Sequence, residues 1–540
     1  MIGDLWYKNA IVYSLDVETF LDANGDGCGD FEGLTRRLDY LEGLGVTAVW
    51  LAPFQPSPRR DDGYDISDFY GVDPRFGSGG DFVEFMREAD SRGIRVLIDL
   101  VVNHTSDRHP WFHEHRDWYV WSRRRPSNWR SGVVFPGVQT STWTYDKQAR
   151  EYYFHRFYDF QPDLDMDNPR VREEVRRVIG YWLQLGVAGF RMDAVPFVLE
   201  KPPRGRGKHE IHFEYLKEFR ELLQWRVGDA VLLGEANVTP QQTLPYFGGG
   251  DGLHMMFNFW VNQHLWLALA TGDVRPLASA LRATQKLPPT AQWAHFLRNH
   301  DELDLGRLAG PEREQVFSAF GPEQSMQLYG RGIRRRPATM LGDRERLELA
   351  YSIVLSLPGT PVLRYGDEIG MGEDLRLKER NAIRTPMQWS DEPNAGFSLG
   401  KTVVRRPVER GSYAFRYVNV EQQRRDSASL LQWTARMIRL RKQCPEIGWG
   451  EWRIVPTGSR AVLAIEYRWR GSTVVCLHNL DDRPRDAKLR IGGGRLANLL
   501  DVEQIEAGRG GVHHIALETY GYRWFRAGGV TPALSRNVED

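Results

Sequence analysis

Eight short apolar runs, separated by segments with helical periodicity, constrain the fold of this chain more than any other feature of its sequence. Each run is almost continuous in apolar residues, as expected for a strand that is buried on both faces. Eight such strands alternating with helices predict an α/β fold, a parallel (β/α)8 TIM barrel. The runs occupy residues 11–17, 48–53, 95–102, 189–194, 231–236, 254–259, 295–301 and 361–368.

The segments between the runs place apolar residues on one face of a helix. In residues 30–45, leucines recur at helical spacing and Gly45 is positioned to end the helix. We therefore expect one helix over 30–45, and the same spacing predicts another over 170–185.

Two stretches interrupt the alternation and predict additional domains. Residues 104–167, after the third run, are irregular, aromatic and rich in arginine, and they are too long for a bare loop. Beyond residue 445 the apolar pattern changes to period two, which predicts an antiparallel β-domain. The expected division is a barrel formed by 1–103 and 168–445, an inserted subdomain at 104–167, and a C-terminal domain of β-sandwich type at 446–540.

The charge balance argues against nucleic acid or an anionic membrane as a partner. Lys plus Arg and Asp plus Glu both number 71, whereas either partner requires a basic excess. The chain has no apolar run of membrane-spanning length, its N-terminus does not resemble a signal peptide, and its three cysteines are too few for a disulfide scaffold. We expect a cytoplasmic protein that acts on a small molecule and that is compatible with a homo-oligomer.

Three carboxylates follow the predicted barrel strands, where the reactive groups of such barrels collect. Asp193, Glu235 and Asp301 come after the fourth, fifth and seventh strands, and Arg191 precedes Asp193 by two residues. Carboxylates placed together repel one another and separate their pKa values. A paired nucleophile and protonated acid are what the cleavage of a glycosidic bond requires.

Five segments carry a resemblance to a known family. IDLVVNH, QPDLD, GFRMDA, GEAN and FLRNHD, in this order along the chain, resemble the conserved segments of glycoside hydrolase family 13, the α-amylase family. The resemblance implies retention of the α-configuration, with Asp193 as nucleophile, Glu235 as general acid/base and Asp301 as the group that binds sugar hydroxyls and stabilises the transition state. Arg191 would lower the pKa of Asp193, and neighbouring negative charge and closure of the site would favour the protonated form of Glu235.

The same resemblance implies further substrate-binding residues. His104 and His300 would donate hydrogen bonds to the hydroxyls of the first glucose. Asp61 and Tyr64 in DDGYD would hold its non-reducing end, with Tyr64 stacked on the ring, and Arg384 in RTPMQW would contact another hydroxyl. A site closed at that end takes short sugars and not starch chains.

Within the family, residues 329–389, 193–197 and 394–398 resemble the branch that interconverts maltose and trehalose. That resemblance implies a transfer within one closed pocket, without an organic cofactor. A hydrolytic α-glucosidase or an intermolecular transglucosylase acting on short α-glucosides is the alternative, and a non-catalytic accessory protein is a third. Glu18, Asp165 and Arg364 depart from the pattern of the branch, the sixth strand FNFWVNQHLW also diverges, and we expect several of these departures near the outer sugar subsite.

A loop with alternating oxygen side chains predicts a structural calcium ion. Asp22, Asn24, Asp26, the Cys28 carbonyl and Asp30 supply oxygen at positions 1, 3, 5, 7 and 9, a spacing that suits Ca²⁺. The loop is not an EF-hand because position 12 is Gly33. A solvated loop of Asx-turns is the alternative interpretation, and a second calcium ion at Asn103 and Asp163 is a weaker prediction.

Overall fold

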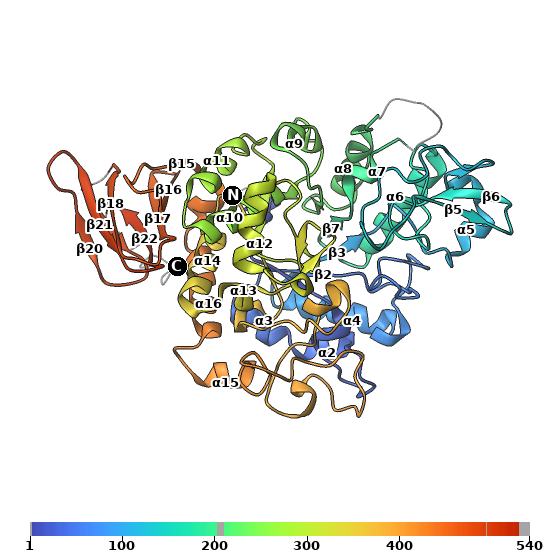
Figure 1. The fold of residues 1–540 in the computed structure, drawn as a ribbon, viewed down its shortest axis with the longest axis horizontal. Helices are drawn as coiled ribbons and strands as arrows, with labels where there is room; N and C mark the ends of the chain where they lie inside the picture. Colours follow the sequence, from blue (N-terminus) through green and yellow to red (C-terminus); the bar gives the residue numbers. More distant parts are fainter. Residues whose placement is uncertain (1–2, 202–209, 493, 529–540) are drawn as a thin grey trace, which may run out of the picture.

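A closed barrel of eight parallel strands forms the centre of the molecule (Figure 1). The computed structural model describes residues 3–201, 210–492 and 494–528. Around the barrel the order is β1-β14-β10-β9-β8-β7-β3-β2, which confirms the predicted (β/α)8 fold. The strands are β1 (Val12–Leu15), β2 (Ala48–Leu51), β3 (Arg95–Leu100), β7 (Gly189–Met192), β8 (Val231–Gly234), β9 (Met255–Phe257), β10 (Gln292–Phe296) and β14 (Thr360–Arg364).

The apolar runs predicted the strands but misplaced their ends. The expected strand over 295–301 is wrong at both ends, because β10 covers Gln292–Phe296 and the residues that follow form a loop. That loop is as buried as the strand, since Leu297, Asn299 and His300 are all shielded from solvent. The chain therefore stays buried at the barrel mouth after the strand has ended, so the buried run in the sequence is longer than the hydrogen-bonded strand.

Two short helices replace the single helix expected over 30–45. They are α2 (Phe31–Arg36), capped by the Asp30 side chain, and α3 (Leu38–Leu44), ended by Gly45 at a φ of 95°. Arg37 lies between them, with its guanidinium 4.2 Å from the centre of the Trp389 ring. Its N–H bonds to the carbonyls of both Leu34 and Thr35, which closes the first helix.

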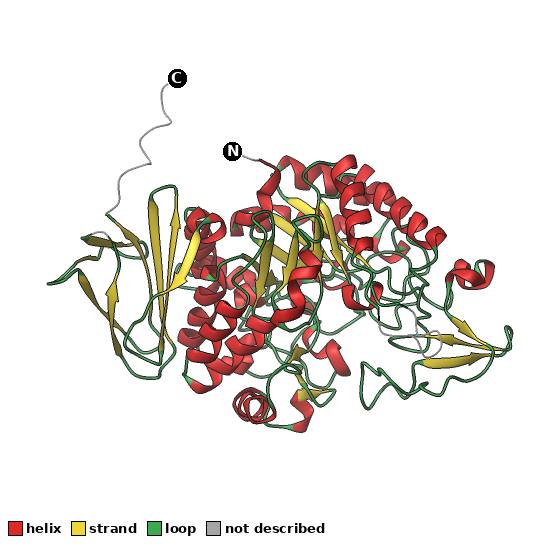
Figure 2. Ribbon diagram, turned by 90° about the horizontal axis from the view of Figure 1, so that it is seen from above, coloured by secondary structure: helices red, strands yellow, loops and turns green. Residues whose placement is uncertain are grey.

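Helices surround the barrel strands (Figure 2). α6 (Pro169–Gln184) confirms the helix predicted over 170–185. Side chains such as Trp50, Leu97 and Phe257 form one buried cluster from alternating strand positions, and a larger cluster joins the strands to the helices. The other longer helices are α4 (Gly79–Ser91), α8 (Glu214–Arg226), α9 (Pro240–Phe247), α10 (Phe259–Thr271), α11 (Arg275–Ala283), α12 (Gly310–Phe320), α14 (Arg344–Ser356) and α16 (Leu430–Lys442).

Two β-structures lie at opposite ends of the molecule (Figure 1). One is the insertion after β3, whose small antiparallel sheet has the order β4-β6-β5, with β4 (Trp121–Ser122), β5 (Trp143–Asp146) and β6 (Glu151–Phe154). The other is the C-terminal antiparallel β-domain, with sheets of order β15-β16-β17-β22-β19-β20 and β18-β21. Its strands are β15 (Glu451–Ile454), β16 (Val462–Trp469), β17 (Ser472–Asn479), β18 (Arg485–Arg490), β19 (Arg495–Asn498), β20 (Gln504–Glu506), β21 (Val512–Leu517) and β22 (Tyr522–Ala527).

A third small sheet lies above the barrel, between β10 and β14 in the chain. It has the order β11-β13-β12, with β11 (Leu303–Asp304), β12 (Gln327–Leu328) and β13 (Gly332–Ile333). One residue, Glu302, separates β11 from Asp301, so the small sheet begins at the barrel mouth.

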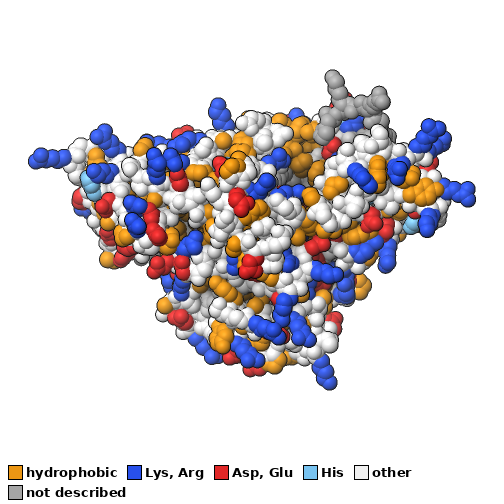
Figure 3. All heavy atoms as spheres, viewed as in Figure 1, with side chains coloured by type: hydrophobic (Ala, Val, Ile, Leu, Met, Phe, Trp, Pro, Cys, Tyr) orange, Lys and Arg blue, Asp and Glu red, His pale blue; other side chains and the backbone are white. Residues whose placement is uncertain are grey.

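Acidic and basic side chains are interspersed over the face of the molecule in Figure 3. This distribution agrees with the equal numbers of acidic and basic residues. Among the residues described, no helix has both the length and the hydropathy needed to cross a membrane.

Candidate active site

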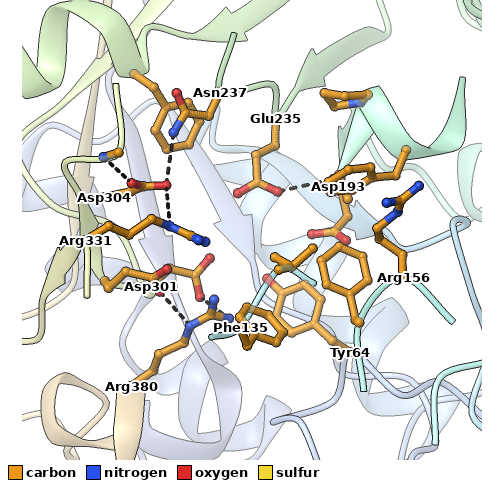
Figure 4. Close-up of a pocket in the computed structure, with 18 of the residues that line it drawn as sticks. Tyr64, Phe135, Arg156, Asp193, Glu235, Asn237, Asp301, Asp304, Arg331 and Arg380 are labelled. Carbon is orange, nitrogen blue, oxygen red and sulfur yellow. Dashed lines mark hydrogen bonds and ion pairs between the residues drawn. The ribbon is translucent and has the colours of Figure 1, made fainter. Parts of the chain in front are cut away.

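A cavity of about 560 Å³ opens at the carboxyl ends of the barrel strands (Figure 4). Six of the residues predicted from the sequence line it: Asp61, Tyr64, His104, Asp193, Glu235 and Asp301. The other three, Arg191, His300 and Arg384, are buried behind this wall and contact the residues that form it.

Arg191 joins the two carboxylates predicted to break and form the glycosidic bond. Its Nη1 lies 2.6 Å from Oδ1 of Asp193 and 2.6 Å from Oδ1 of Asp99, and its Nη2 lies 2.8 Å from Oε2 of Glu235. The barrel register explains the arrangement, because Arg191 on β7 pairs with Asp99 on β3 and Leu233 on β8. The Arg191 side chain is 1% exposed, so water does not compete for these contacts.

The two carboxylates have raised pKa values. Burial raises the pKa of Asp193 to about 6, with Arg191 opposing this effect and Asp99 and Asp301 adding to it. Burial also raises the pKa of Glu235 to about 7, again opposed by Arg191 and reinforced by Asp193 and Asp301. Arg191 lowers the pKa of Asp193, as expected, but burial and the neighbouring carboxylates outweigh the guanidinium, so the net shift is upward. Glu235 remains the weaker acid of the two, as a proton donor should.

Ala194 holds Glu235 from the backbone. It follows Asp193 and has a φ of 47°, a left-handed conformation that an alanine rarely adopts. In this conformation its N–H donates a hydrogen bond of 3.2 Å to Oε2 of Glu235. The turn after β7 thus fixes Asp193 and Glu235 relative to each other.

Asp301 faces these two residues across the cavity and lies beside two arginines and a histidine (Figure 4). Its Oδ1 lies 3.0 Å from Arg380 Nη1 and 3.0 Å from Arg384 Nη2, and its Oδ2 lies 3.4 Å from His300 Nε2. Burial acts to raise the pKa of Asp301, but Arg380, His300 and Arg384 hold that pKa well below its usual range. Asp301 therefore keeps a negative charge through the neutral pH range.

Tyr64 and His104 line the cavity, and His300 lies behind Tyr64. Its ring stacks on His300 at a centroid distance of 5.5 Å, and its hydroxyl lies 2.8 Å from His300 Nε2. His104 donates from Nε2 to the Tyr64 carbonyl at 3.0 Å, and its Nδ1 accepts from Asn103. Burial lowers the pKa of His104 to about 4, so its ring is neutral. Both nitrogens of His104 already have partners within the protein. In this arrangement His104 therefore has no free N–H to donate to a sugar hydroxyl, as the resemblance implied it would.

Asp61 closes the same end of the cavity. Its Oδ2 accepts a hydrogen bond of 2.9 Å from Gln161. Burial raises the pKa of Asp61 to about 6, with Arg380 opposing the effect. This carboxylate is therefore available to accept hydrogen bonds from sugar hydroxyls at neutral pH.

A family model for the α-amylase catalytic domain matches residues 16–320 and 333–450. The chain belongs to the α-amylase family, glycoside hydrolase family 13. A second model, for a sucrose hydrolase-like C-terminal domain, matches residues 471–526 within the C-terminal β-domain.

Curated relatives within the family include enzymes named for trehalose synthesis. A trehalose synthase of Thermus thermophilus is 45% identical over 488 residues, which are 88% of this chain and 50% of the relative, so the chain spans half the length of that protein. The trehalose synthase/amylase TreS of Mycobacterium tuberculosis H37Rv is 39% identical over 96% of this chain and 90% of its own length.

Solved structures of the family share the fold over the whole chain. An α-amylase from H. orenii is 28% identical with a TM-score of 0.77, covering 96% of this chain and 99% of its own. A mutant of the trehalulose synthase MutB in complex with Tris is 26% identical with a TM-score of 0.78, covering 97% of this chain and 100% of its own.

The cavity contains functional groups that the sequence did not predict. Phe135 comes from the inserted subdomain and lies 4.9 Å from the Arg380 guanidinium, measured from the ring centre. Arg331 and Asp304 come from the small sheet, and Asn237 follows Glu235 by two residues. The aromatic composition of the insertion was the sequence signal for Phe135. The signal for Arg380 was its position, four residues before Arg384, which opens the motif RTPMQW.

Glu18, Asp165 and Arg364, three of the departures from the maltose–trehalose branch, do not line the cavity, whereas Phe259 in the divergent sixth-strand segment does. Glu18 is buried between Arg59 at 2.8 Å and Arg405 at 3.1 Å. Arg364 is buried with its guanidinium 4.6 Å from the centre of the Tyr365 ring. Asp165 lines a separate surface depression on the inserted subdomain.

The loop predicted to bind calcium lies between α1 (Val17–Phe20) and α2. Asp22 accepts hydrogen bonds from the backbone of Gly25 and Gly27, and Asp30 accepts from Ala23, Asn24 and Gly33. The side chains of Asn24 and Asp26 likewise accept from the backbone of Asp26 and Cys28. Within the described ranges no group of three or more His, Cys, Asp or Glu side chains is arranged to hold a metal. Oxygen donors of this kind suit Ca²⁺, but they are turned toward backbone N–H groups, and calcium stays a prediction.

Proposed function

We propose that this chain is a retaining α-glucosyl-transfer enzyme that interconverts maltose and trehalose through a glucosyl ester on Asp193. The observation that carries the proposal is the single buried guanidinium of Arg191 joining Asp193 to Glu235. This contact keeps the two carboxylates close together, as a mechanism with a covalent intermediate requires. The names and coverage of the relatives support the choice of maltose and trehalose.

The first step breaks the bond between the two glucose units. An Asp193 oxygen attacks the anomeric carbon, and the bond from that carbon to the bridging oxygen breaks. Glu235 gives its proton to the departing oxygen, so the second glucose leaves as a neutral alcohol. Asp301 and the Asp193 carboxylate stabilise the positive charge that develops on the ring.

The second step reverses the first with a different hydroxyl. The released glucose turns and presents its anomeric hydroxyl to the glucosyl ester. Glu235, now ionised, takes the proton of that hydroxyl while the new C–O bond forms and the bond to Asp193 breaks. Trehalose leaves, and both carboxylates return to their starting protonation states.

Water competes with the released glucose for the ester. Phe135 and Phe157 of the inserted subdomain line the cavity together with Val133 and Val134, and these apolar groups reduce the space for water. Attack by water yields two glucose molecules. A predominantly hydrolytic α-glucosidase is therefore the alternative, and an oligo-1,6-glucosidase of Parageobacillus thermoglucosidasius is 32% identical over 84% of this chain.

Product analysis tests the proposal. The protein is incubated with maltose and, separately, with trehalose, and the sugars are resolved by chromatography. We expect trehalose from maltose and maltose from trehalose, with free glucose as a minor product. Glucose as the dominant product from both sugars would establish the hydrolase instead.

A further inference from the structure

We infer that Arg331, held by Asp304, binds the released glucose and sets how often it returns to the ester instead of escaping. This inference rests on the proposed function and specifies the acceptor side of the same cavity. Its structural basis is the small sheet β11-β13-β12, which brings one arginine into the cavity opposite Tyr64 (Figure 4).

The segment that carries Arg331 is an addition to the part of the chain that the family model describes. The model matches residues 16–320 and 333–450, and residues 321–332 fall between the two ranges. This segment contains β12 and ends at Gly332, the first residue of β13. The group it supplies to the cavity therefore lies outside the matched catalytic core.

The backbone of Arg331 is fixed beside the loop that carries Asp301. Asp304 on β11 pairs with Gly332 on β13, and the Leu305 N–H donates a hydrogen bond of 2.8 Å to the Arg331 carbonyl. The position of the Arg331 Cα is thus tied to a strand that begins two residues after Asp301.

The side chain of Arg331 is held at one point and open at its end. Its Nε lies 3.5 Å from Oδ2 of Asp304, the oxygen that also accepts from Asn237 Nδ2 at 3.1 Å. The other oxygen of Asp304 accepts from the Gly306 N–H at 2.7 Å. For the terminal nitrogens of Arg331, the described part of the chain supplies no hydrogen-bond partner. Figure 4 shows these nitrogens extending toward the space between Glu235 and Asp301.

The second glucose departs from the anomeric carbon of the unit bonded to Asp193, so it occupies the side of the cavity away from Asp193. Asp193 and Tyr64 lie on one side of Glu235, and Arg331, Asp304 and Asn237 lie on the other (Figure 4). A planar guanidinium presents parallel N–H groups that fit a pair of neighbouring sugar hydroxyls. Because these hydroxyls recur around the glucose ring, Arg331 retains a contact when the ring turns to present its anomeric hydroxyl.

The test compares Arg331→Ala and Arg331→Lys with Gln324→Ala, an exposed position in the same segment that serves as the control. Each variant is given maltose, and the ratio of trehalose to free glucose is measured. Each is also given 4-nitrophenyl α-glucoside, whose leaving group is not a sugar. The melting temperature of each variant verifies that it is folded.

We expect Arg331→Ala to raise the share of glucose among the products by about ten-fold, the effect of losing hydrogen bonds from a charged group. Turnover of the nitrophenyl glucoside should stay near that of Gln324→Ala, because the first sugar site is intact. Arg331→Lys should lie between wild type and Arg331→Ala, since it keeps the charge and loses the planar fork. An unchanged product ratio in folded Arg331→Ala, or an equal loss on both substrates, would overturn the inference.

The failure of the proposed function is distinguishable from the failure of this inference. If the wild-type enzyme forms no trehalose from maltose, the interconversion is wrong. In that case, a rise in KM for maltose in Arg331→Ala, without a rise in KM for the nitrophenyl glucoside, would still indicate that Arg331 binds the second sugar. An unchanged KM for maltose would reject that assignment as well.

Discussion

The N–H of Ala194, the residue after Asp193, donates a hydrogen bond of 3.2 Å to Oε2 of Glu235. The bond depends on the left-handed conformation of Ala194, with φ at 47° and ψ at 39°. A glycine adopts this conformation without steric cost, whereas a β-branched residue does not. The orientation of Glu235 is therefore coupled to the backbone of the turn that carries Asp193.

Substitution of Ala194 tests this coupling. We expect Ala194→Val to lower kcat/KM for maltose and the melting temperature, because the branched side chain drives the backbone out of the left-handed region. Ala194→Gly should change the free energy of unfolding by no more than about 1 kcal/mol, since relief of the strain offsets the added freedom of the unfolded chain. Equal effects of the two substitutions would argue against a role for the backbone conformation.

The pKa values of the two acids predict a narrow pH optimum for maltose. Asp193 must be ionised to attack, and burial raises its pKa to about 6, so activity should fall as the pH drops below about 6. Glu235 must be protonated in the first step, and burial raises its pKa to about 7, so activity should also fall as the pH rises above about 7. A profile of kcat/KM against pH measures both limbs. A flat profile between pH 5 and 9 would contradict the assigned protonation states.

Substrates with different leaving groups separate the roles of the two acids. Asp193→Ala should lose several orders of magnitude in kcat on every substrate, because no other group forms the ester. Glu235→Gln should fail on maltose but retain more activity on α-glucosyl fluoride, whose leaving group needs no proton. Substantial turnover by Asp193→Ala, or an equal loss of both substrates in Glu235→Gln, would reverse the assignments.

The sequence predicted the barrel and its catalytic acids for different reasons. Continuous apolar runs report burial on both faces, and the acids stand in segments characteristic of the family. Arg380, Arg331 and Phe135 could not be placed in the cavity, because the paths of their loops depend on contacts between segments far apart in the chain. Arg380, for example, lies in the short 3-10 helix Glu379–Ile383, after a residue with a φ of 45°.

Glu18 departs from the pattern of the branch, but it does not line the cavity. It follows β1 and is buried. The partners that enclose it come from residues 59 and 405, and neither spacing nor periodicity links these positions to Glu18. Ion pairs between distant segments of this kind leave no pattern in a single sequence.

Chelation tests the calcium prediction. Asp22 and Asp30 are buried in one loop, and the pKa of Asp30 is raised by burial and by the charge of Asp22. A bound cation would relieve this repulsion, so removal of calcium with a chelator should lower the melting temperature, and calcium should restore it better than magnesium. An unchanged melting temperature, together with no calcium by elemental analysis, would show that the backbone hydrogen bonds are sufficient to hold the loop.

The buried ion pairs of Glu18 predict a large effect on stability. The Glu18 side chain is 3% exposed and contacts Arg59, itself 7% exposed, at 2.8 Å. Glu18→Gln removes the negative charge that Arg59 and Arg405 share and leaves two positive charges buried without it. Removal of one partner from such a buried cluster lowers the free energy of unfolding by about 3 kcal/mol or more. Glu32→Gln provides the control, because its pair with Arg36 is more than half exposed on both sides and contributes little. Thermal or denaturant unfolding of the two variants compares the effects. If both variants unfold like the wild-type protein, the network does not contribute to stability.

The same ion-pair network reaches Asp301. Arg405 also pairs with Asp62, and Asp62 pairs with Arg384, which contacts Asp301. Glu18→Gln should therefore also loosen the support of Asp301 and lower kcat.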